Sequence, residues 1–355
     1  MKKVMVVIPA LGSGGGERLA VSLIAKMNPQ NISTRLVILY PYQDTENARF
    51  AMASGIDTIY LNKHRGFDIK IVSKLKKEIK RFAPDIIQTH LYTVSYVLLA
   101  APRKKIKYHT VHNVAEKEAY GMRRLITYIA FRFGNFVPIA ISPYCAKTIE
   151  DVYHIESSKF PCIVNGVDIE KYRPEPESHA EIRFINVGRL QTQKNQALLI
   201  KAFKKVHEEK PNTKLKIVGE GELRPELEML VKKMKLEDSV DMPGQSSEVQ
   251  KELNSADIYV QSSDFEGLPI SVLEAMACGL PIISTKAGGT VDIVHNDENG
   301  FLVDVDDEDG FVEKMRILSA NYQMRKKMGQ TSRKIVLDYS IEECARKYEE
   351  LYINS

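Results

Sequence analysis

The sequence predicts an α/β protein with two Rossmann-like, doubly wound domains, and three observations lead to this fold class. The chain has 355 residues, which is enough for two domains of ordinary size. Short β-rich apolar runs alternate along it with segments whose apolar residues recur at helical spacing, as repeated βα units require. The alternation restarts after residues 162–175, near the turn and break signals Asn165-Gly166, Pro174 and Pro176. That stretch is therefore expected to link two domains.

The first half is expected to begin with a buried strand at 4–8, followed by a glycine-rich loop and a helix, which is how a doubly wound domain opens. Further strands are expected at 35–40, 58–62, 84–90, 107–113 and from 136, and further helices at 69–82, 94–102, 123–133 and up to 151. Parallel sheets of this kind bind ligands at the carboxyl ends of their strands. Candidate site residues are therefore expected in the loops that follow these strands.

The second half repeats the pattern. Strands are expected at 182–188, 240–245 and 255–267, with a βα unit at 215–230, a helix at 197–209, and a further helix followed by a short strand from 281 within 262–290. The segment 341–352 has helical spacing and is expected to cross back to the first domain. The predicted first domain is thus 1–165 with a C-terminal helix at about 340–355, and the second is 166–339.

Composition excludes several classes of protein. With 27% charged residues and no apolar run of about 18 residues, the chain has the profile of a soluble globular protein rather than a membrane-spanning one. The apolar start is too short for a signal peptide and is interpreted as the first strand. The four cysteines are scattered without metal-type spacing, which fits a reducing cytoplasm.

The charge distribution is uneven between the two halves. Residues 1–165 hold 24 Lys/Arg against 12 Asp/Glu, whereas residues 166–355 hold 26 against 34. A basic half joined to an acidic half suggests two domains with different partners. The basic half could face anionic lipid or an anionic acceptor, and residues 123–133 form a basic, aromatic, amphipathic segment that could touch a membrane surface. No aromatic-basic recognition module supports nucleic-acid binding.

The most informative stretch is 262–290, which holds Glu266 and Glu274 eight positions apart. A helix is expected between them, and eight residues is about two turns, so the two carboxylates are expected to share a face. The backbone at the start of that helix favours an anion such as a phosphate. The residues at this start, expected to bind substrate, are Gly267, Leu268 and Pro269.

The strings EGLPISVLE and EAMACGLPIIST resemble the E-x7-E signature of the retaining glycosyltransferases of family 4. The resemblance implies the GT-B fold, in which two Rossmann-like domains face each other across a cleft. It also implies transfer of a sugar from a nucleotide-sugar donor to an acceptor, with retention of configuration and without a metal ion or other cofactor. Glu274 would then bind the ribose hydroxyls, and Glu266 the sugar hydroxyls or the developing oxocarbenium ion.

Three further strings are similar to those of the same family. GRLQTQKN resembles its phosphate loop, so Arg189 and Lys194 are expected to hold the donor diphosphate and stabilise the leaving group. The glycine-rich loop resembles GG-x-ER, with Gly15 and Gly16 beside the diphosphate and the acceptor; many relatives carry alanine where Gly16 stands. In the Val-His-Asn setting, His112 is expected to contact the transferred sugar, with Asn113 beside it, whereas His90 is interpreted as structural.

Several readings of the function stay open on the sequence. The favoured one is transfer of a hexose or N-acetylhexosamine, with UDP expected by analogy, to a glycan or lipid-linked glycan in cell-surface polysaccharide synthesis, by a cytoplasmic enzyme that could lie peripherally on the inner face of the membrane. A GT-B enzyme with a small soluble acceptor, an epimerase and a non-catalytic nucleotide-sugar-binding scaffold are the alternatives. A phosphorylase would require a pyridoxal phosphate lysine and a longer chain.

Overall fold

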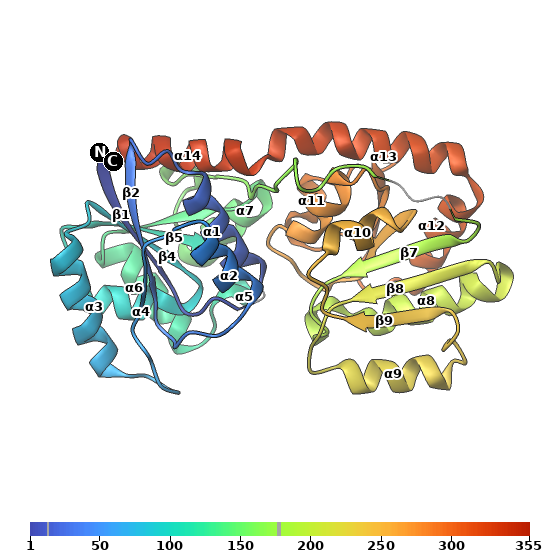
Figure 1. Cartoon of the computed structure of the whole chain (residues 1–355), viewed down its shortest axis with the longest axis horizontal. Helices are drawn as coiled ribbons and strands as arrows, with labels where there is room; N and C mark the ends of the chain where they lie inside the picture. Colours follow the sequence, from blue (N-terminus) through green and yellow to red (C-terminus); the bar gives the residue numbers. More distant parts are fainter. Residues whose placement is uncertain (13, 176–178) are drawn as a thin grey trace. The chain divides into compact units, whose positions relative to one another are not determined.

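The protein forms two compact units, seen in a computed structural model that describes residues 1–12, 14–175 and 179–355 (Figure 1). The first unit comprises Met1–Gly166 and Ile341–Ser355, and the second comprises Val167–Ser340. Ser13 of the glycine-rich loop and Pro176 of the predicted link lie outside the described residues. Each unit contains a six-stranded parallel sheet, which confirms the predicted α/β class.

The sheet of the first unit has the order β3-β2-β1-β4-β5-β6. Its strands are β1 (Lys2–Ile8), β2 (Ile32–Ile38), β3 (Thr58–Tyr60), β4 (Ile86–His90), β5 (Ile106–Val111) and β6 (Phe136–Ala140). Its helices are α1 (Gly15–Lys26), α2 (Glu46–Ala53), α3 (Ile69–Phe82), α4 (Val94–Ala100), α5 (Ala115–Glu118), α6 (Met122–Phe133), α7 (Pro143–Tyr153) and α14 (Ile341–Ile353). Because the order reverses at β1 and β4, a ligand-binding crevice is expected beyond their carboxyl ends.

Local sequence explains why these helices form and which face they bury. In α3 the Asp68 carboxylate accepts a hydrogen bond from the Lys70 amide and caps the helix. Its apolar stripe, which includes Leu75 and Ile79, is buried in a core shared with α4 and α6. Burying one such side chain contributes about 1.5–3 kcal/mol. At the chain end, α14 packs against α1, and the Thr110 and Tyr348 hydroxyls lie 3.1 Å apart.

The second unit repeats this architecture, with the sheet order β12-β11-β10-β7-β8-β9. Its strands are β7 (Ile182–Val187), β8 (Thr213–Val218), β9 (Val240–Gly244), β10 (Ile258–Gln261), β11 (Ile282–Thr285) and β12 (Gly300–Val303). Its helices are α8 (Gln196–Glu209), α9 (Arg224–Lys233), α10 (Val249–Asn254), α11 (Ile270–Ala277), α12 (Glu308–Ala320) and α13 (Tyr322–Val336). The order reverses at β7 and β10, so the loops after these two strands meet at one crevice.

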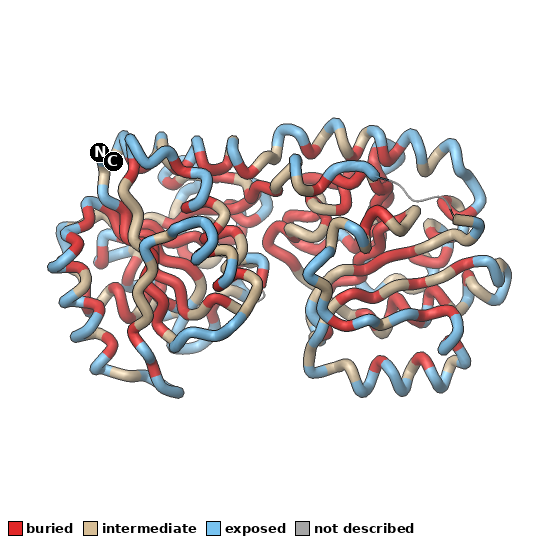
Figure 2. The backbone as a smooth tube through the Cα atoms, viewed as in Figure 1, coloured by how far each residue is buried: buried red, intermediate tan, exposed pale blue. Residues whose placement is uncertain are grey.

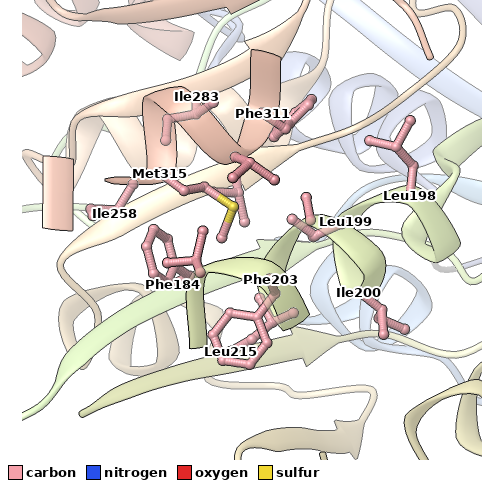
Figure 3. Packing of buried hydrophobic residues seen from close by; sticks show 14 of the residues in the cluster. Phe184, Leu198, Leu199, Ile200, Phe203, Leu215, Ile258, Ile283, Phe311 and Met315 are labelled. Carbon is pink, nitrogen blue, oxygen red and sulfur yellow. The ribbon is translucent and has the colours of Figure 1, made fainter. Parts of the chain in front are cut away.

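The central strands of both sheets are buried within their own units and red in Figure 2, whereas the edge strands β3 and β9 are only partly buried. In the second unit, Phe184 of β7 and Leu215 of β8 pack with Phe203 of α8 and with Phe311 and Met315 of α12 (Figure 3). These side chains hold the sheet against its helices and so fix where its strands end. None of the described helices is long and apolar enough to cross a membrane.

Candidate active site

In the second unit, the loops after β7 and β10 meet, and an ion pair joins them. Lys194 lies at the end of a short 3₁₀ helix, Thr192–Lys194, in the loop after β7, and Glu266 lies in the loop after β10. The Lys194 Nζ is 2.5 Å from Glu266 Oε1, and the Ser263 hydroxyl donates to the same oxygen at 2.6 Å. Two residues that the sequence places 72 positions apart therefore share one site.

Backbone and side-chain hydrogen bonds hold the two loops together around this pair. The Asp264 amide donates to the Gln193 carbonyl at 2.8 Å, and the Gln193 side chain donates to the Phe265 carbonyl at 2.8 Å. The Ser262 hydroxyl donates to the Lys194 carbonyl at 3.0 Å. Because Lys194 and Glu266 are both positioned by such contacts, the site is rigid before any substrate arrives, which favours electrostatic stabilisation.

The ion pair lies in a largely desolvated position, with the Lys194 side chain 19% exposed and that of Glu266 8% exposed. A buried carboxylate is costly unless a cation and hydrogen bonds compensate it. Lys194 supplies the cation here and Ser263 the hydrogen bond. An incoming phosphate would compete with Glu266 for the Lys194 ammonium, which would leave Glu266 free to accept hydrogen bonds from hydroxyl groups of a ligand.

A helix lies between Glu266 and Glu274, as expected, and Glu266 precedes it. Only Glu274 lies on α11, because the helix begins at Ile270, four residues after Glu266. Both carboxylates act on the buried Tyr259. Burial raises the pKa of its phenol, and the charges of Glu266 and Glu274 raise that pKa further. The Tyr259 hydroxyl donates to Ser271 Oγ at 2.9 Å, beneath the start of α11. Sequence reasoning missed Tyr259, because a tyrosine in a buried strand carries no specific signal.

The start of α11 has the form that was predicted. Gly267, Leu268 and Pro269 are buried and lead directly into the helix, whose first amides have no partners within it. The backbone of Gly288 packs directly against the loop that carries Glu266. Gly288 has a φ of +56°, and an added Cβ there would lie 1.7 Å from the Glu266 carbonyl oxygen, so only glycine allows this close approach. The next amide, that of Gly289, donates to the Gly267 carbonyl at 2.8 Å.

Arg189 is placed differently from Lys194. It follows β7 and is exposed, and its guanidinium makes no ion pair with any residue that the structure describes. Its backbone carbonyl accepts a hydrogen bond from the Gln196 side chain at 2.9 Å, which holds the loop, while the guanidinium extends into solvent. Lys194 is thus a preset charge, whereas Arg189 can move toward an anion.

In the first unit, the loop after β5 and the start of α1 meet at His112. The imidazole packs on Gly16, where an added Cβ would lie 3.2 Å from His112 Nδ1. Its Nε2 is 2.8 Å from His90 Nδ1 at the end of β4. Gly15 is the first residue of α1 and Asn113 follows His112, so the structure brings together the residues that the sequence nominated in this half. His90 is buried and supports His112 directly.

Burial keeps the imidazoles of this cluster neutral. It lowers the pKa of His112 to about 4, and it lowers the pKa of His109, which also feels His112, to about 3. The pKa of His90 falls well below its ordinary value, chiefly through burial and then through His112 and His109. At neutral pH, one ring nitrogen of His112 donates and the other accepts, and because Nε2 is engaged with His90, Nδ1 is the nitrogen left for a ligand.

Glu118 is a buried carboxyl at this site that sequence reasoning missed. It ends α5, the short helix after His112, and hydrogen bonds from the backbone amides of His112 and Asn113 favour its charged form. Burial outweighs them and raises its pKa to about 7, and its Oε1 is buried without a hydrogen-bond partner. Its spacing from His112 matches no pattern used above, so only the fold reveals it. Among the described residues, no three His, Cys, Asp or Glu side chains are grouped to hold a metal ion.

Gly16 provides a graded test of His112. We expect Gly16→Ala to keep kcat/KM within about threefold, because the ring must yield only a few tenths of an ångström. Gly16→Val places two more carbons against the ring and should lower kcat/KM by about a hundredfold, since misplacing a substrate-contacting group by about 1 Å has that effect. Steady-state kinetics with the preferred donor measures both. Equal activity of the valine variant and the wild type would contradict the placement of His112.

The histidine cluster also predicts acid sensitivity of folding. Because the folded-state pKa values of His90, His109 and His112 lie below the ordinary value, the unfolded chain binds more protons below pH 6.5. The three neutral histidines therefore contribute fully to the free energy of unfolding above pH 6.5, and this contribution is lost as pH falls toward about 4. Glu118 acts oppositely, because its raised pKa makes its contribution fall as pH rises from about 4.5 to about 7. Three histidines outweigh one glutamate, so the melting temperature should fall between pH 7 and pH 5.

Two variants separate these contributions. His109→Gln removes one of the three depressed imidazoles and should make the dependence of the melting temperature on pH shallower. Glu118→Gln removes the opposing group and should make it steeper. Thermal unfolding at four pH values between 5 and 7.5 measures the slopes, and the same slope in all three proteins would contradict the proposed titrations.

Comparison with known proteins agrees with this geometry. The family model Glycosyl transferases group 1 matches residues 168–335, and the model Glycosyltransferase Family 4 matches residues 13–171. Together they extend over most of the chain and meet at the boundary between the two units. A solved structure of HepE from Anabaena with UDP-glucose aligns over 100% of both chains with a TM-score of 0.88 at 17% identity, which supports the GT-B fold.

Curated relatives extend the comparison. The Escherichia coli UDP-Gal:alpha-D-GlcNAc-diphosphoundecaprenol alpha-1,3-galactosyltransferase is 26% identical over 309 residues, which cover 81% of this chain and 80% of that protein. A Campylobacter jejuni enzyme that transfers N-acetylgalactosamine to a diphospho-undecaprenol-linked glycan is 26% identical over 348 residues, 92% of each chain. A glycosyltransferase of Methanocaldococcus jannaschii is 32% identical over 61% of this chain and 59% of its own length.

Proposed function

This chain belongs to glycosyltransferase family 4, and from that premise we propose that it moves a hexose or N-acetylhexosamine from a UDP-sugar to a lipid-linked glycan in cell-surface polysaccharide synthesis. That it is a glycosyltransferase follows from the family. The choice of UDP is supported by the name of the Escherichia coli relative, and the choice of a lipid-linked acceptor by the names of the Escherichia coli and Campylobacter jejuni relatives. We further propose that transfer retains the anomeric configuration and requires no metal ion.

The observation that carries the proposal is the preset pair of Lys194 and Glu266 beside the start of α11. In the proposed donor complex, Lys194 and the exposed Arg189 bind the diphosphate, and the first amides of α11 add partial positive charge. Glu274 accepts hydrogen bonds from the ribose hydroxyls. Glu266, released from Lys194, accepts hydrogen bonds from the sugar.

The proposed reaction breaks the bond between the sugar C1 and the phosphate oxygen, and UDP leaves with the electron pair. The acceptor hydroxyl oxygen bonds to C1 on the same face, and its proton passes to the departing phosphate oxygen. Lys194 and Arg189 stabilise the negative charge that develops on that oxygen. The diphosphate can therefore leave without a metal ion. Neutral His112 holds a sugar hydroxyl, with Gly15, Gly16 and Asn113 shaping its surroundings.

Charge supports the assignment of the acceptor to the first unit and the donor to the second. The first unit holds 26 Lys/Arg against 16 Asp/Glu, and the second holds 24 against 30. A lipid-linked acceptor that carries a diphosphate is anionic, so a basic unit attracts it. In the second unit, the local cations Lys194 and Arg189 attract the donor despite its net negative charge.

The experiment is a donor and acceptor panel on the purified full chain. Binding of UDP- and GDP-linked sugars is measured by calorimetry, and transfer to N-acetylglucosamine-diphosphoundecaprenol in detergent is followed by mass spectrometry with EDTA present. Nuclear magnetic resonance of the product gives the anomeric configuration. Transfer of one UDP-sugar with retention supports the proposal. Transfer only to a soluble sugar would favour the small-acceptor alternative, and donor binding without any turnover would favour the scaffold.

A further inference from the structure

The helix α6 (Figure 1) has an outward face that is apolar, which is the reverse of an ordinary surface helix. It buries the small residues Thr127 and Ala130. Phe131 is half-buried against the core, whereas four other large apolar residues are exposed: Met122 is 69%, Leu125 51%, Ile129 38% and Phe133 57% exposed. They are spaced three or four positions apart and therefore form one stripe along the helix, which we call the α6 stripe.

An apolar stripe of this kind is unfavourable in water and marks an interaction surface. Single exposed apolar residues are normal, but a contiguous set is not. Two tyrosines flank the stripe, with Tyr120 70% and Tyr128 38% exposed. Tyrosine has an apolar ring and a polar hydroxyl, so it suits a boundary between an apolar and an aqueous phase.

The charged residues along this stretch of the sequence all have one sign. The sequence has no Asp or Glu between Glu118 and Glu150, whereas Arg123 and Arg132 are exposed on α6 itself. At the end of the helix, the Asn135 side chain donates to the Lys105 carbonyl at 3.0 Å and so holds the basic loop 103–105 beside it. The Lys107 ammonium reinforces this contact, because it donates to the carbonyls of both Lys105, at 2.7 Å, and Gly134, at 2.9 Å.

The other end of the helix lies near the candidate site of the first unit. The Arg123 guanidinium lies 5.3 Å from the centre of the Tyr92 ring, and Tyr92 follows His90 at the carboxyl end of β4. Burial raises the pKa of the Tyr92 phenol most, and the Tyr40 phenol and the Glu17 carboxylate raise it further. The Arg123 guanidinium lowers the same pKa. The apolar stripe thus runs from a basic loop to the edge of the sheet where His112 lies.

We propose that the α6 stripe, with Arg132 and the basic loop 103–105, docks on an anionic lipid bilayer. This inference rests on the proposed function, because docking would hold the first unit at the level at which a lipid-linked acceptor presents its diphosphate. Apolar side chains along one face with arginines beside them are the features of a helix that lies in the membrane interface. The absence of acidic groups along this segment favours an anionic bilayer over a neutral one.

Vesicle flotation of the full chain, without donor or acceptor, tests the proposal. We expect binding to vesicles that contain 30% phosphatidylglycerol. Binding to pure phosphatidylcholine should be at least about tenfold weaker, because each basic residue near an anionic surface adds to the free energy of membrane binding. Leu125→Gln/Ile129→Gln should weaken binding to the anionic vesicles by at least about tenfold, since it removes two apolar side chains from the interface.

A matched control is Met52→Gln/Met229→Gln, which removes two apolar side chains that are 57% and 64% exposed on α2 and α9. It should bind vesicles as the wild type does. Arg103→Gln/Lys104→Gln should reduce the preference for anionic vesicles, whereas the exposed pair Lys232→Gln/Lys233→Gln on α9 should not. Circular dichroism and UDP binding confirm that each variant is folded.

Three outcomes would overturn docking: no binding of the wild type to anionic vesicles, equal loss in the stripe variant and its control, or a wild-type dimer that the stripe variant converts to a monomer. The last would show that the stripe joins two copies of the chain. Failure of docking is distinguishable from failure of the proposed function, because transfer in detergent does not require vesicles. The stripe variant should keep that transfer within about twofold of the wild type.

Discussion

Replacing Lys194 by alanine should lower kcat/KM for the donor by about a hundred- to a thousandfold, the effect of removing one preset charge-stabilising donor. The ammonium lies 2.5 Å from Glu266 Oε1 and is held in place by the loop after β7. Its removal also leaves the Glu266 carboxylate buried with two donors, the Ser263 hydroxyl at 2.6 Å and the Gln193 side chain at 3.4 Å. Stability should therefore fall as well, by less than the 3–5 kcal/mol typical of a fully buried pair.

The matched control is Lys201→Ala, which removes an exposed lysine from the same βα unit, on α8. Its kinetics and melting temperature should equal those of the wild type. Calorimetric titration with UDP separates binding from chemistry: Lys194→Ala should weaken UDP binding, and Lys201→Ala should not. If Lys194→Ala turns over the donor within threefold of the wild type, Lys194 is not the phosphate-binding group.

Gly288→Ala should have an effect of similar size, although Gly288 itself carries no functional group. Its φ of +56° is costly for alanine, by about 1–2 kcal/mol, and the added Cβ would lie 1.7 Å from the Glu266 carbonyl oxygen. The loop that carries Glu266 and Gly267 must then move. A displacement of about 1 Å in a substrate-binding group lowers the rate about a hundredfold, so kcat/KM should fall by at least that factor.

Gly55→Ala separates backbone strain from displacement of the site. Gly55 has a similar φ of +65°, but an added Cβ there meets no atom within 4 Å. Both variants should lose melting temperature through the strained backbone, and only Gly288→Ala should lose donor turnover. Loss of turnover in both would show that destabilisation alone explains the effect, and full turnover by Gly288→Ala would contradict the contact.

The candidate site residues of the two units differ in how clearly the sequence indicated them. The neighbourhood of Glu266 and Lys194 lies in strings whose residue order is informative, because loops that bind phosphates need glycines, forked donors and helix starts at set spacings. His112 was predicted from its position after a strand together with the resemblance of its Val-His-Asn setting to the family. Glu118 was missed, because its importance comes from burial and from the amides of His112 and Asn113, neither of which a linear pattern records.

Local sequence placed a helix between the two glutamates, and the structure has it from Ile270, directly after Pro269. For α6 the sequence predicted a basic, amphipathic helix, and the structure has it at Met122–Phe133. Periodicity could not tell which face is outward, because small residues such as Thr127 and Ala130 can pack closely and displace larger ones to the surface.

By itself, the sequence determined the class of fold, the alternation of strands and helices and the family, because apolar periodicity and loop chemistry are local properties. The tertiary structure alone decided which loops meet. In each unit the strand order reverses between the first and fourth strands, which brings the loops after β7 and β10 together and joins Lys194 to Glu266. Such contacts depend on strand pairing between distant segments, where burial and hydrogen bonding act between residues that no local pattern connects.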